Sequence, residues 1–231
     1  MRVAALYDVH GNAPALEAVL AEVDSEGIDQ VVFGGDVASG PLPRETLELV
    51  RSRDAVSVRG NADRLESPEA SAEEDEGRLW ILQELDREEI EWLANLPFSA
   101  VIDDVLYVHA TPKDDESVIT ELTTEERLAE LLDGVDQHLV VAGHTHMQLE
   151  RRVGATHFVN AGSVGRPYEA VPGAYWAVIA DGEVEFRRTD YDLERAAAAI
   201  RASGHPMANE LAAENVLTIP SREEALTAFG G

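Results

Sequence analysis

The chain lacks cysteine, so it can form neither a disulfide bond nor a thiolate metal site. It also lacks any apolar run near the ~18 residues that a membrane-spanning helix requires. The N-terminus reaches Asp8 and His10 too early to form the sustained apolar segment of a signal peptide. We therefore expect a cytoplasmic protein with no membrane partner.

Positive charge is scarce as well. The chain has 18 lysines and arginines against 45 acidic residues, a net charge of −27, and Lys113 is its only lysine. Such a surface repels nucleic-acid backbones, so we expect no duplex nucleic acid as a partner. A solvated acidic surface, for example an adaptation to salt or heat, is favoured over recognition of a cationic substrate.

The 231 residues, 45% of them hydrophobic, are enough for one sizeable core. Short apolar runs at 2–8, 29–36 and 55–61 are separated by segments with helical spacing at 12–27 and 43–53. This alternation is typical of a parallel sheet with crossover helices. The acidic segment that follows, residues 67–77, is expected to be a solvated loop or the entry to a helix.

The second half of the chain predicts more strands and two final helices. Two helices that break near Asp86 come first, followed by a hairpin, a capped helix and further strands with turns at Gly154 and Asp181-Gly182. Residues 193–204 and 206–217 then show helical spacing. With no linker in the sequence, we expect one domain over 1–231, with 190–231 as a C-terminal helical extension.

Seven residues of the metal-ligand type lie at or just beyond the ends of predicted strands: Asp8, His10, Asp36, Asn61, His109, His144 and His146. Sites in open α/β sheets form at this edge. In an extended chain, the side chains of residues i and i+2 point the same way, so Asp8 and His10 are expected to bind one ion. By the same argument, His144 and His146 are expected to face one side.

The chemistry of this set indicates metals and an anionic substrate. Imidazole, carboxylate and amide ligands without sulfur suit Mn²⁺, Fe²⁺, Zn²⁺, Ni²⁺ or Co²⁺. Seven ligands exceed what one ion with an open position needs, so we expect two divalent ions that share a bridging carboxylate. Their charge outweighs that of Asp8 and Asp36, which favours a small phosphoester as the substrate.

Five motifs in this order resemble those of the calcineurin-like metallophosphoesterase superfamily: DVHGN (8–12), GGDVASGP (34–41), GNAD (60–63), HATP (109–112) and GHTH (143–146). NAGSVGRP (160–167) is similar to a segment of the small bacterial and archaeal phosphodiesterase branch. The resemblance implies an α/β fold, a four-layer αββα sandwich of two mixed β-sheets flanked by helices.

The resemblance also implies roles for the ligands. Asp8, His10 and His146 would bind one metal, Asn61, His109 and His144 the other, and Asp36 would bridge both. A metal-bridging hydroxide would attack phosphorus, which makes Asp36, Asn61 and Asp63 the residues assigned to catalysis. The C-terminal helices have apolar residues at helical spacing and no set of metal ligands, so we expect them to pack on the sheets or on a partner chain and not to close the metal site. A homo-oligomer is left open.

One position departs from the superfamily pattern. Many members carry histidine after the motif's asparagine, where this chain has Ala62. That histidine protonates the leaving group or steadies a phosphoryl oxygen, and a general acid typically contributes ~10²–10⁴-fold. Small phosphodiesterases of the branch often lack it. Ala62 therefore predicts a preference for phosphodiesters, or for esters with good leaving groups.

Three residues outside the metal set are predicted to contact substrate: Asn12, Lys113 and Arg166. Arg166 would bind phosphate through two parallel hydrogen bonds, and Lys113 would act as a point charge. An exposed loop position explains Lys113 equally well, and a helix N-cap explains Asn12 equally well.

The favoured function is a dinuclear phosphodiesterase. The alternatives are a phosphomonoesterase, a protein phosphatase or a dinucleoside-polyphosphate hydrolase on the same fold, and a non-catalytic scaffold. Because all seven ligand positions are filled, an enzyme is favoured over a scaffold.

Overall fold

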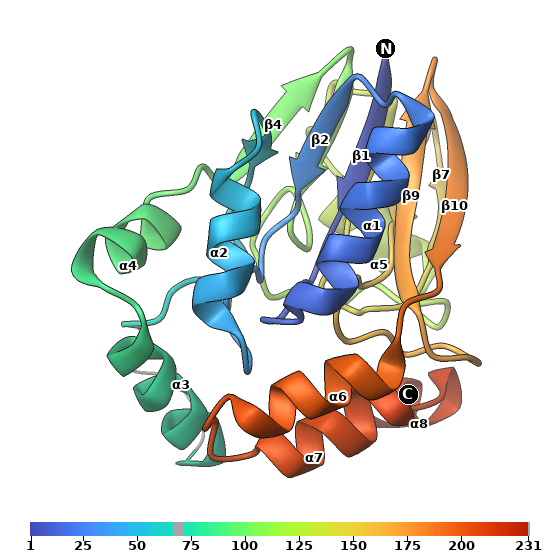
Figure 1. Ribbon diagram of the computed structural model, residues 1–231. Coiled ribbons are helices and arrows are strands. Elements are labelled where there is room, and N and C mark those ends of the chain that lie inside the picture. The colour runs from blue at the N-terminus through green and yellow to red at the C-terminus, as the bar shows by residue number, and fades with distance from the viewer. Residues whose placement is uncertain (67–71, 231) are drawn as a thin grey trace.

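The computed structural model describes residues 1–66 and 72–230 of the chain. Two five-stranded sheets pack face to face, and helices cover their outer faces (Figure 1). The predicted four-layer αββα sandwich is therefore confirmed. The first part of the acidic segment 67–77 lies outside the described residues. No helix in the described ranges is long and apolar enough to cross a membrane.

The first sheet has a parallel core. Its parallel strands are β1 (Arg2–Leu6), β2 (Gln30–Phe33) and β3 (Val56–Ser57), connected by the helices α1 (Ala13–Glu26) and α2 (Pro43–Arg51). The antiparallel strands β9 (Ala174–Ala180) and β10 (Glu183–Thr189) extend it to the order β10-β9-β1-β2-β3. The strand–helix alternation identified the parallel part, whereas β9 and β10 make the sheet mixed.

The second sheet begins with the expected hairpin of β4 (Ser99–Ile102) and β5 (Val105–Val108). Strands β6 (Leu139–Ala142) and β8 (Thr156–Asn160) continue it in parallel to β5, and β7 (Leu149–Val153) closes it antiparallel to β8. The helix α5 (Glu125–Leu131) packs on its outer face, and the Thr124 side chain caps it by accepting from Arg127 N.

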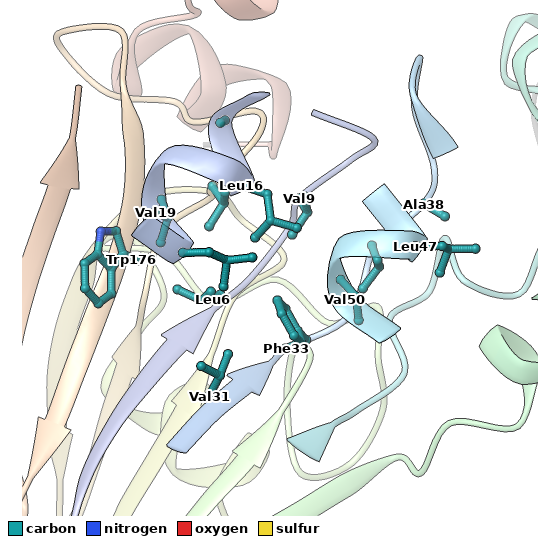
Figure 2. Close-up of a cluster of buried hydrophobic side chains, with 14 of the residues drawn as sticks. Leu6, Val9, Leu16, Val19, Val31, Phe33, Ala38, Leu47, Val50 and Trp176 are labelled. Carbon is teal, nitrogen blue, oxygen red and sulfur yellow. The ribbon is translucent and has the colours of Figure 1, made fainter. Parts of the chain in front are cut away.

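Both faces of β1 are buried, which explains why its sequence is an unbroken apolar run. Ala4 and Leu6 pack against the helices on one face, in the cluster shown in Figure 2. Val3, Ala5 and Tyr7 point the other way and pack between the two sheets. This period of two places β1 at the centre of the sandwich, so the loop that leaves its carboxyl end is held by both cores.

The remaining helices follow the expected order. They are α3 (Ala72–Glu84), α4 (Arg87–Ala94), α6 (Leu193–Ala202), α7 (Ala208–Ala212) and α8 (Arg222–Ala228). Asp86 forms a capping box at the start of α4, at the break seen in the sequence. The segment predicted as one helix over 206–217 changes after α7 into a π-helical turn, η1 (Ala213–Leu217). Figure 1 shows α6 and α7 crossing below the start of α1, at the carboxyl end of β1.

Candidate metal centre

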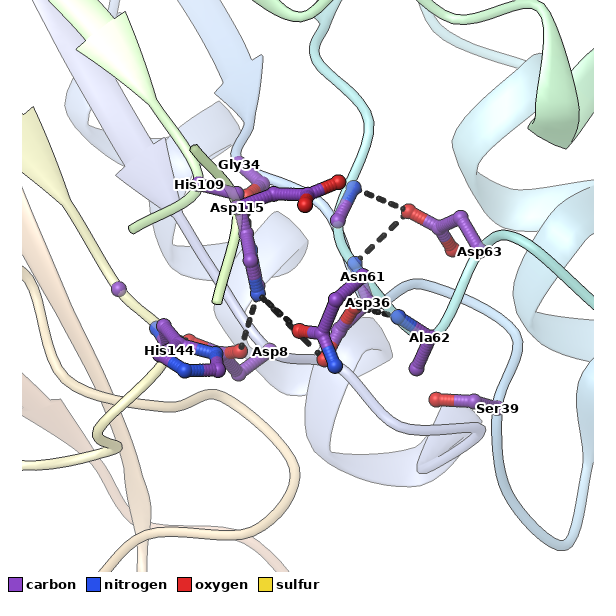
Figure 3. Close-up of polar contacts among 12 residues, drawn as sticks. Asp8, Gly34, Asp36, Ser39, Asn61, Ala62, Asp63, His109, Asp115 and His144 are labelled. Atoms are coloured by element: carbon purple, nitrogen blue, oxygen red, sulfur yellow. Dashed lines mark hydrogen bonds and ion pairs between the residues drawn. The ribbon is translucent and has the colours of Figure 1, made fainter. Parts of the chain in front are cut away.

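Loops after β1, β2, β3, β5 and β6 carry the predicted ligands. Two groups have ligand atoms within 4.8 Å of one another: Asp8, His10 and His146, and Asp8, Asp36 and His109. Asn61 joins the second group, because its Oδ1 lies 2.9 Å from Nε2 of His109 (Figure 3). The His144 ring lies outside both groups, with its centroid 5.2 Å from that of His109. The seven residues are thus brought together from both sheets.

The backbone at these ligands is left-handed and not extended. The φ angles are 53° at Asp8, 46° at His10, 52° at Asp36, 68° at His144 and 58° at His146. Non-glycine residues rarely adopt such angles, and strained backbone of this kind clusters at functional sites. The extended conformation predicted for these residues is therefore wrong, although Asp8 and His10 do lie in one group.

His144 and His146 have different neighbours. The ring of His146 lies 4.8 Å from that of His10, whereas the ring of His144 contacts His109. The two rings therefore contact different predicted ligands, His10 and His109.

Backbone carbonyls hold three of the imidazoles in one orientation. His146 Nδ1 lies 2.7 Å from Arg166 O, and His109 Nδ1 lies 2.9 Å from Gly34 O. His10 Nδ1 lies 3.2 Å from Ser39 O. A carbonyl only accepts, so these contacts favour the tautomer with the hydrogen on Nδ1, which leaves Nε2 of a neutral ring free to bind a metal. Such outer contacts fix the tautomer of metal-binding histidines.

The two carboxylates divide their oxygens between backbone and site. Asp8 Oδ2 accepts from His144 N at 2.8 Å, whereas Asp8 Oδ1 is buried without a hydrogen-bond partner. The Nε2 atoms of His146, His10 and His109 lie 3.3, 3.9 and 3.9 Å from Asp8 Oδ1. An orphaned carboxylate oxygen among imidazole lone pairs is a donor set that fits divalent transition metals.

Asp36 repeats this arrangement between the two groups. Its Oδ1 accepts from Ala62 N at 2.8 Å, and its Oδ2 lies 3.6 Å from Nε2 of His10 and 3.5 Å from Nε2 of His109. One oxygen is therefore held by the backbone, while the other lies between histidines of both groups.

Burial sets the protonation states of the site. It lowers the pKa of His10 well below its usual range and that of His144 to about 4, so both rings are neutral at neutral pH. Burial also raises the pKa of Asp36 to about 6. At His109, burial alone would lower the pKa, but the nearby carboxylates raise it. At Asp8, burial alone would raise the pKa, but the nearby histidines lower it. Neutral imidazole is the form that binds metals.

Two glycines allow the carboxylates to approach the backbone. A Cβ on Gly60 would lie 2.1 Å from Asp36 Oδ1, and a Cβ on Gly143 would lie 2.3 Å from Asp8 Oδ2. Any side chain at either position would displace a ligand.

Asp63 has a structural role that differs from the predicted catalytic one. Its carboxylate is buried and accepts from Asp36 N at 2.9 Å, Val37 N at 3.0 Å and Gly60 N at 2.8 Å. Because these bonds use both oxygens, Asp63 is a positioning residue that joins the loops after β2 and β3.

Two of the predicted substrate contacts have other partners. Asn12 caps α1 by accepting from Ala15 N at 3.3 Å, and its amide donates to Gly165 O at 3.1 Å and to the Tyr191 hydroxyl at 3.3 Å. The ammonium of Lys113 donates to Asp133 O at 2.6 Å, and no described ligand contacts it. The structural alternatives therefore explain both residues.

Arg166 does lie at the site. It lines a narrow cavity with His10, and its buried Nε has no hydrogen-bond partner. Residues of α6, α7 and η1 also line this cavity. The C-terminal helices thus come close to His10, but they contribute no residue to the two groups of metal-ligand atoms.

Three polar residues that were not predicted as site residues position the ligands. Ser39 Oγ lies 2.9 Å from His10 Nδ1, and Ser163 Oγ donates to Asp8 O at 2.7 Å. The Asn160 amide donates to Gly143 O and to Thr145 Oγ1, which fixes the loop after β6. All three lie inside the motifs GGDVASGP and NAGSVGRP, so the motifs contained the signal.

An αββα sandwich that gathers histidines, aspartates and an asparagine at its strand ends has the architecture of a metal-dependent phosphoesterase. Residues 1–183 match the family model described as the calcineurin-like phosphoesterase superfamily domain. The chain belongs to this family, and it is a metallophosphoesterase, a hydrolase of phosphoric esters.

Three proteins from other organisms are similar to this chain. A crystal structure of a metallophosphoesterase from Sphaerobacter thermophilus is 28% identical, with a TM-score of 0.77 over 92% of this chain and 99% of that chain. A hypothetical protein of Pyrococcus horikoshii, at 21% identity, shares the fold with a TM-score of 0.80 over 91% of this chain and 97% of its own. An uncharacterized protein of Methanocaldococcus jannaschii is 26% identical over 84% of this chain and 89% of its own length.

Proposed function

We propose that the protein is a phosphodiesterase that works with two divalent transition metals. The observation that carries the proposal is the position of Asp36. Its Oδ2 lies 3.6 Å from His10 Nε2 and 3.5 Å from His109 Nε2, one histidine from each group. A carboxylate in this position suits a ligand shared by two ions, which in two-metal sites lie about 3.5–4 Å apart.

Each metal would have its own set of residues. Asp8, His10 and His146 would hold the first, and Asn61, His109 and His144 the second, with Asp36 common to both. When bound, two divalent ions supply a water of lowered pKa and positive charge for the phosphoryl oxygens. Manganese, iron, zinc, nickel and cobalt all suit these ligands, and the octahedral preference and carboxylates favour manganese for the first test.

The chain's own residues position the ester. Arg166 offers a guanidinium with no ionic partner among the described residues, and its backbone carbonyl holds His146 at 2.7 Å. A guanidinium fork matches two oxygens of a phosphate, so Arg166 would orient the ester with respect to the ligands.

Ala62 limits the leaving groups. Hydrolysis adds a water oxygen to phosphorus and breaks the bond to an alcohol or phenol oxygen, which needs a proton unless it is a stable anion. Ala62 provides its backbone N–H to Asp36 and no acidic side chain, and both oxygens of the nearby Asp63 accept backbone bonds. This arrangement favours esters whose leaving group departs as a weakly basic anion.

A pair of substrates with one leaving group tests this function. Ethyl p-nitrophenyl phosphate and p-nitrophenyl phosphate would be compared at saturating Mn²⁺, and then with Ni²⁺, Zn²⁺ and Mg²⁺. We expect kcat/KM at least about tenfold higher for the diester. A higher value for the monoester, or for a phosphopeptide or dinucleoside polyphosphate in the same panel, would assign one of the alternative functions.

A further inference from the structure

The narrow cavity beside the metal centre has two chemically different walls. Its volume is about 30 Å³, and His10 and Arg166 form the polar wall together with the loop after Ser39. Ile200, Leu211 and Val216 form an apolar wall, and Asn215 lines the cavity beside them. A water-sized group needs about 10–15 Å³ measured in this way, so the cavity accepts about two or three non-hydrogen atoms.

The apolar wall comes from outside the shared domain. The family model matches residues 1–183, whereas α6, α7 and η1 begin at Leu193. These elements therefore line the cavity beside His10 with residues that the superfamily motifs do not include.

Close packing holds this wall against the catalytic loops. Ala196, Ala197 and Ala212 are fully buried in one cluster with Ala13, the first residue of α1. Small side chains let helices approach closely, so the wall is set by backbone packing. The Tyr191 hydroxyl, which accepts from Asn12, ties the segment before α6 to the same loop.

The π-helical turn presents the residues at the cavity. Thr218 N donates to Ala213 O at 2.9 Å, which closes the wide turn. Such turns appear frequently at functional sites. Here the turn directs the consecutive residues Asn215 and Val216 to the cavity. The Asn215 amide makes no hydrogen bond to any described residue, so it remains available to a ligand.

We propose that the C-terminal helices determine substrate specificity by accepting the retained substituent of the phosphodiester, the group that stays on phosphorus. The substrate class is a phosphodiester with a short, uncharged aliphatic substituent that carries a hydroxyl. Its carbons contact Leu211 and Val216, its hydroxyl bonds to Asn215, and Arg166 binds the phosphate. This inference rests on the proposed phosphodiesterase function.

A substrate series with one leaving group tests the cavity. The substrates are p-nitrophenyl phosphodiesters whose second substituent is methyl, ethyl, 2-hydroxyethyl or phenyl. For the wild type we expect the highest kcat/KM with 2-hydroxyethyl and a value about tenfold lower with phenyl. Binding of ethyl methylphosphonate and phenyl methylphosphonate, measured by calorimetry on the metal-loaded protein, provides a readout independent of turnover.

Variants assign the effect to the wall. Leu211→Ala and Val216→Ala should each raise kcat/KM for phenyl relative to ethyl by about tenfold, and Asn215→Leu should remove the preference for 2-hydroxyethyl over ethyl. Glu214→Gln, at an exposed position of the same turn, is the matched control and should change neither ratio. Leu211 is only half-buried, so Leu211→Ala tests the proposal even if Val216→Ala fails to fold.

The outcomes separate this inference from the function on which it rests. Unchanged substituent ratios in all three variants would overturn the proposal while leaving a phosphodiesterase. A wild type that prefers phenyl would overturn it as well. If the wild type cleaves no diester, the proposed function fails, and the phosphonate binding ratios in the same variants still decide whether the helices select the substituent.

Discussion

Nε2 of His10 lies 3.1 Å from Nε2 of His146. Nδ1 of His146 lies against Arg166 O, and Nδ1 of His10 lies against Ser39 O and Oγ. These contacts favour the tautomers with the hydrogen on Nδ1, in which the two Nε2 lone pairs face each other. Two neutral acceptors at this distance repel each other. A cation between them would remove the repulsion, because both lone pairs would then bind it. The fold therefore holds this pair in the geometry of a metal site through contacts behind the rings.

Ser39 should matter for metal affinity although it is not a ligand. Its Oγ lies 2.9 Å from His10 Nδ1, while its carbonyl provides a second, longer contact. Losing such a contact typically costs 10–100-fold in metal affinity, so for Ser39→Ala we expect about tenfold weaker Mn²⁺ binding. Calorimetric titration of the metal-free protein measures this. Ser25→Ala, at an exposed position of α1, is the control; equal affinities in both variants would remove Ser39 from the account.

Asp63 should act through stability and loop geometry. Asp63→Asn leaves at most one acceptor oxygen for three buried N–H groups, which should destabilise the fold by roughly 1–3 kcal/mol. Urea unfolding measures the loss, and Asp136→Asn on the surface should show none. If Asp63→Asn keeps full stability but loses turnover, Asp63 is the catalytic residue that the motif predicts.

Ala62 should set the dependence of rate on the leaving group. Ala62→His places an imidazole after Asn61, and it should raise turnover of alkyl esters relative to nitrophenyl esters, by up to about 10²-fold. Rates for one alkyl and one nitrophenyl diester, in wild type and variant, give the ratio. Ala21→His, exposed on α1, controls for the added ring. A wild type that already cleaves both esters equally fast would show that another acid is present.

His205 should make the fold sensitive to acid. Its ring is buried against Trp80 and accepts from Met207 N at 3.1 Å, and burial lowers its pKa below the usual 6.5. The unfolded chain therefore takes up a proton first as pH falls below about 6.5, and the free energy of unfolding falls until the folded pKa is reached.

The size of this effect is limited by one proton. His205→Asn should reduce the pH slope of the unfolding free energy by at most about 1.4 kcal/mol per pH unit below pH 6.5. Urea titrations at a series of pH values measure the slope, with His138→Asn at an exposed position as control. Identical slopes in wild type and His205→Asn would contradict the assignment.

Much of the fold and of the site followed from local patterns. The apolar runs gave the strands, because β1 and β6 are buried on both faces, and the ligands sit where those runs end. Backbone conformation at the ligands did not follow, because the left-handed angles of Asp8 and His144 depend on contacts with distant loops. The same holds for Asp63, because two of its three donors, Asp36 N and Val37 N, come from the loop after β2.

The position of the C-terminal helices was beyond the sequence for another reason. The spacing of their apolar residues predicts an apolar helix face, but it does not predict which part of the chain packs against that face. The partner turned out to be the start of α1 and Leu42, next to His10. Two statements stay predictions from the sequence: that the protein does not bind duplex nucleic acid, and that it is cytoplasmic. Whether it forms a homo-oligomer stays open.

Metal content per chain tests the central claim most directly. Wild type, His10→Ala, Asp36→Asn and the surface control Asp136→Asn would be reconstituted with Mn²⁺, freed of excess metal and analysed by inductively coupled plasma mass spectrometry. We predict about two ions in the wild type and control, about one in His10→Ala and fewer than one in Asp36→Asn, because Asp36 lies between the two groups. A wild type that saturates at one ion, or an Asp36→Asn variant that retains two, would contradict the two-metal account.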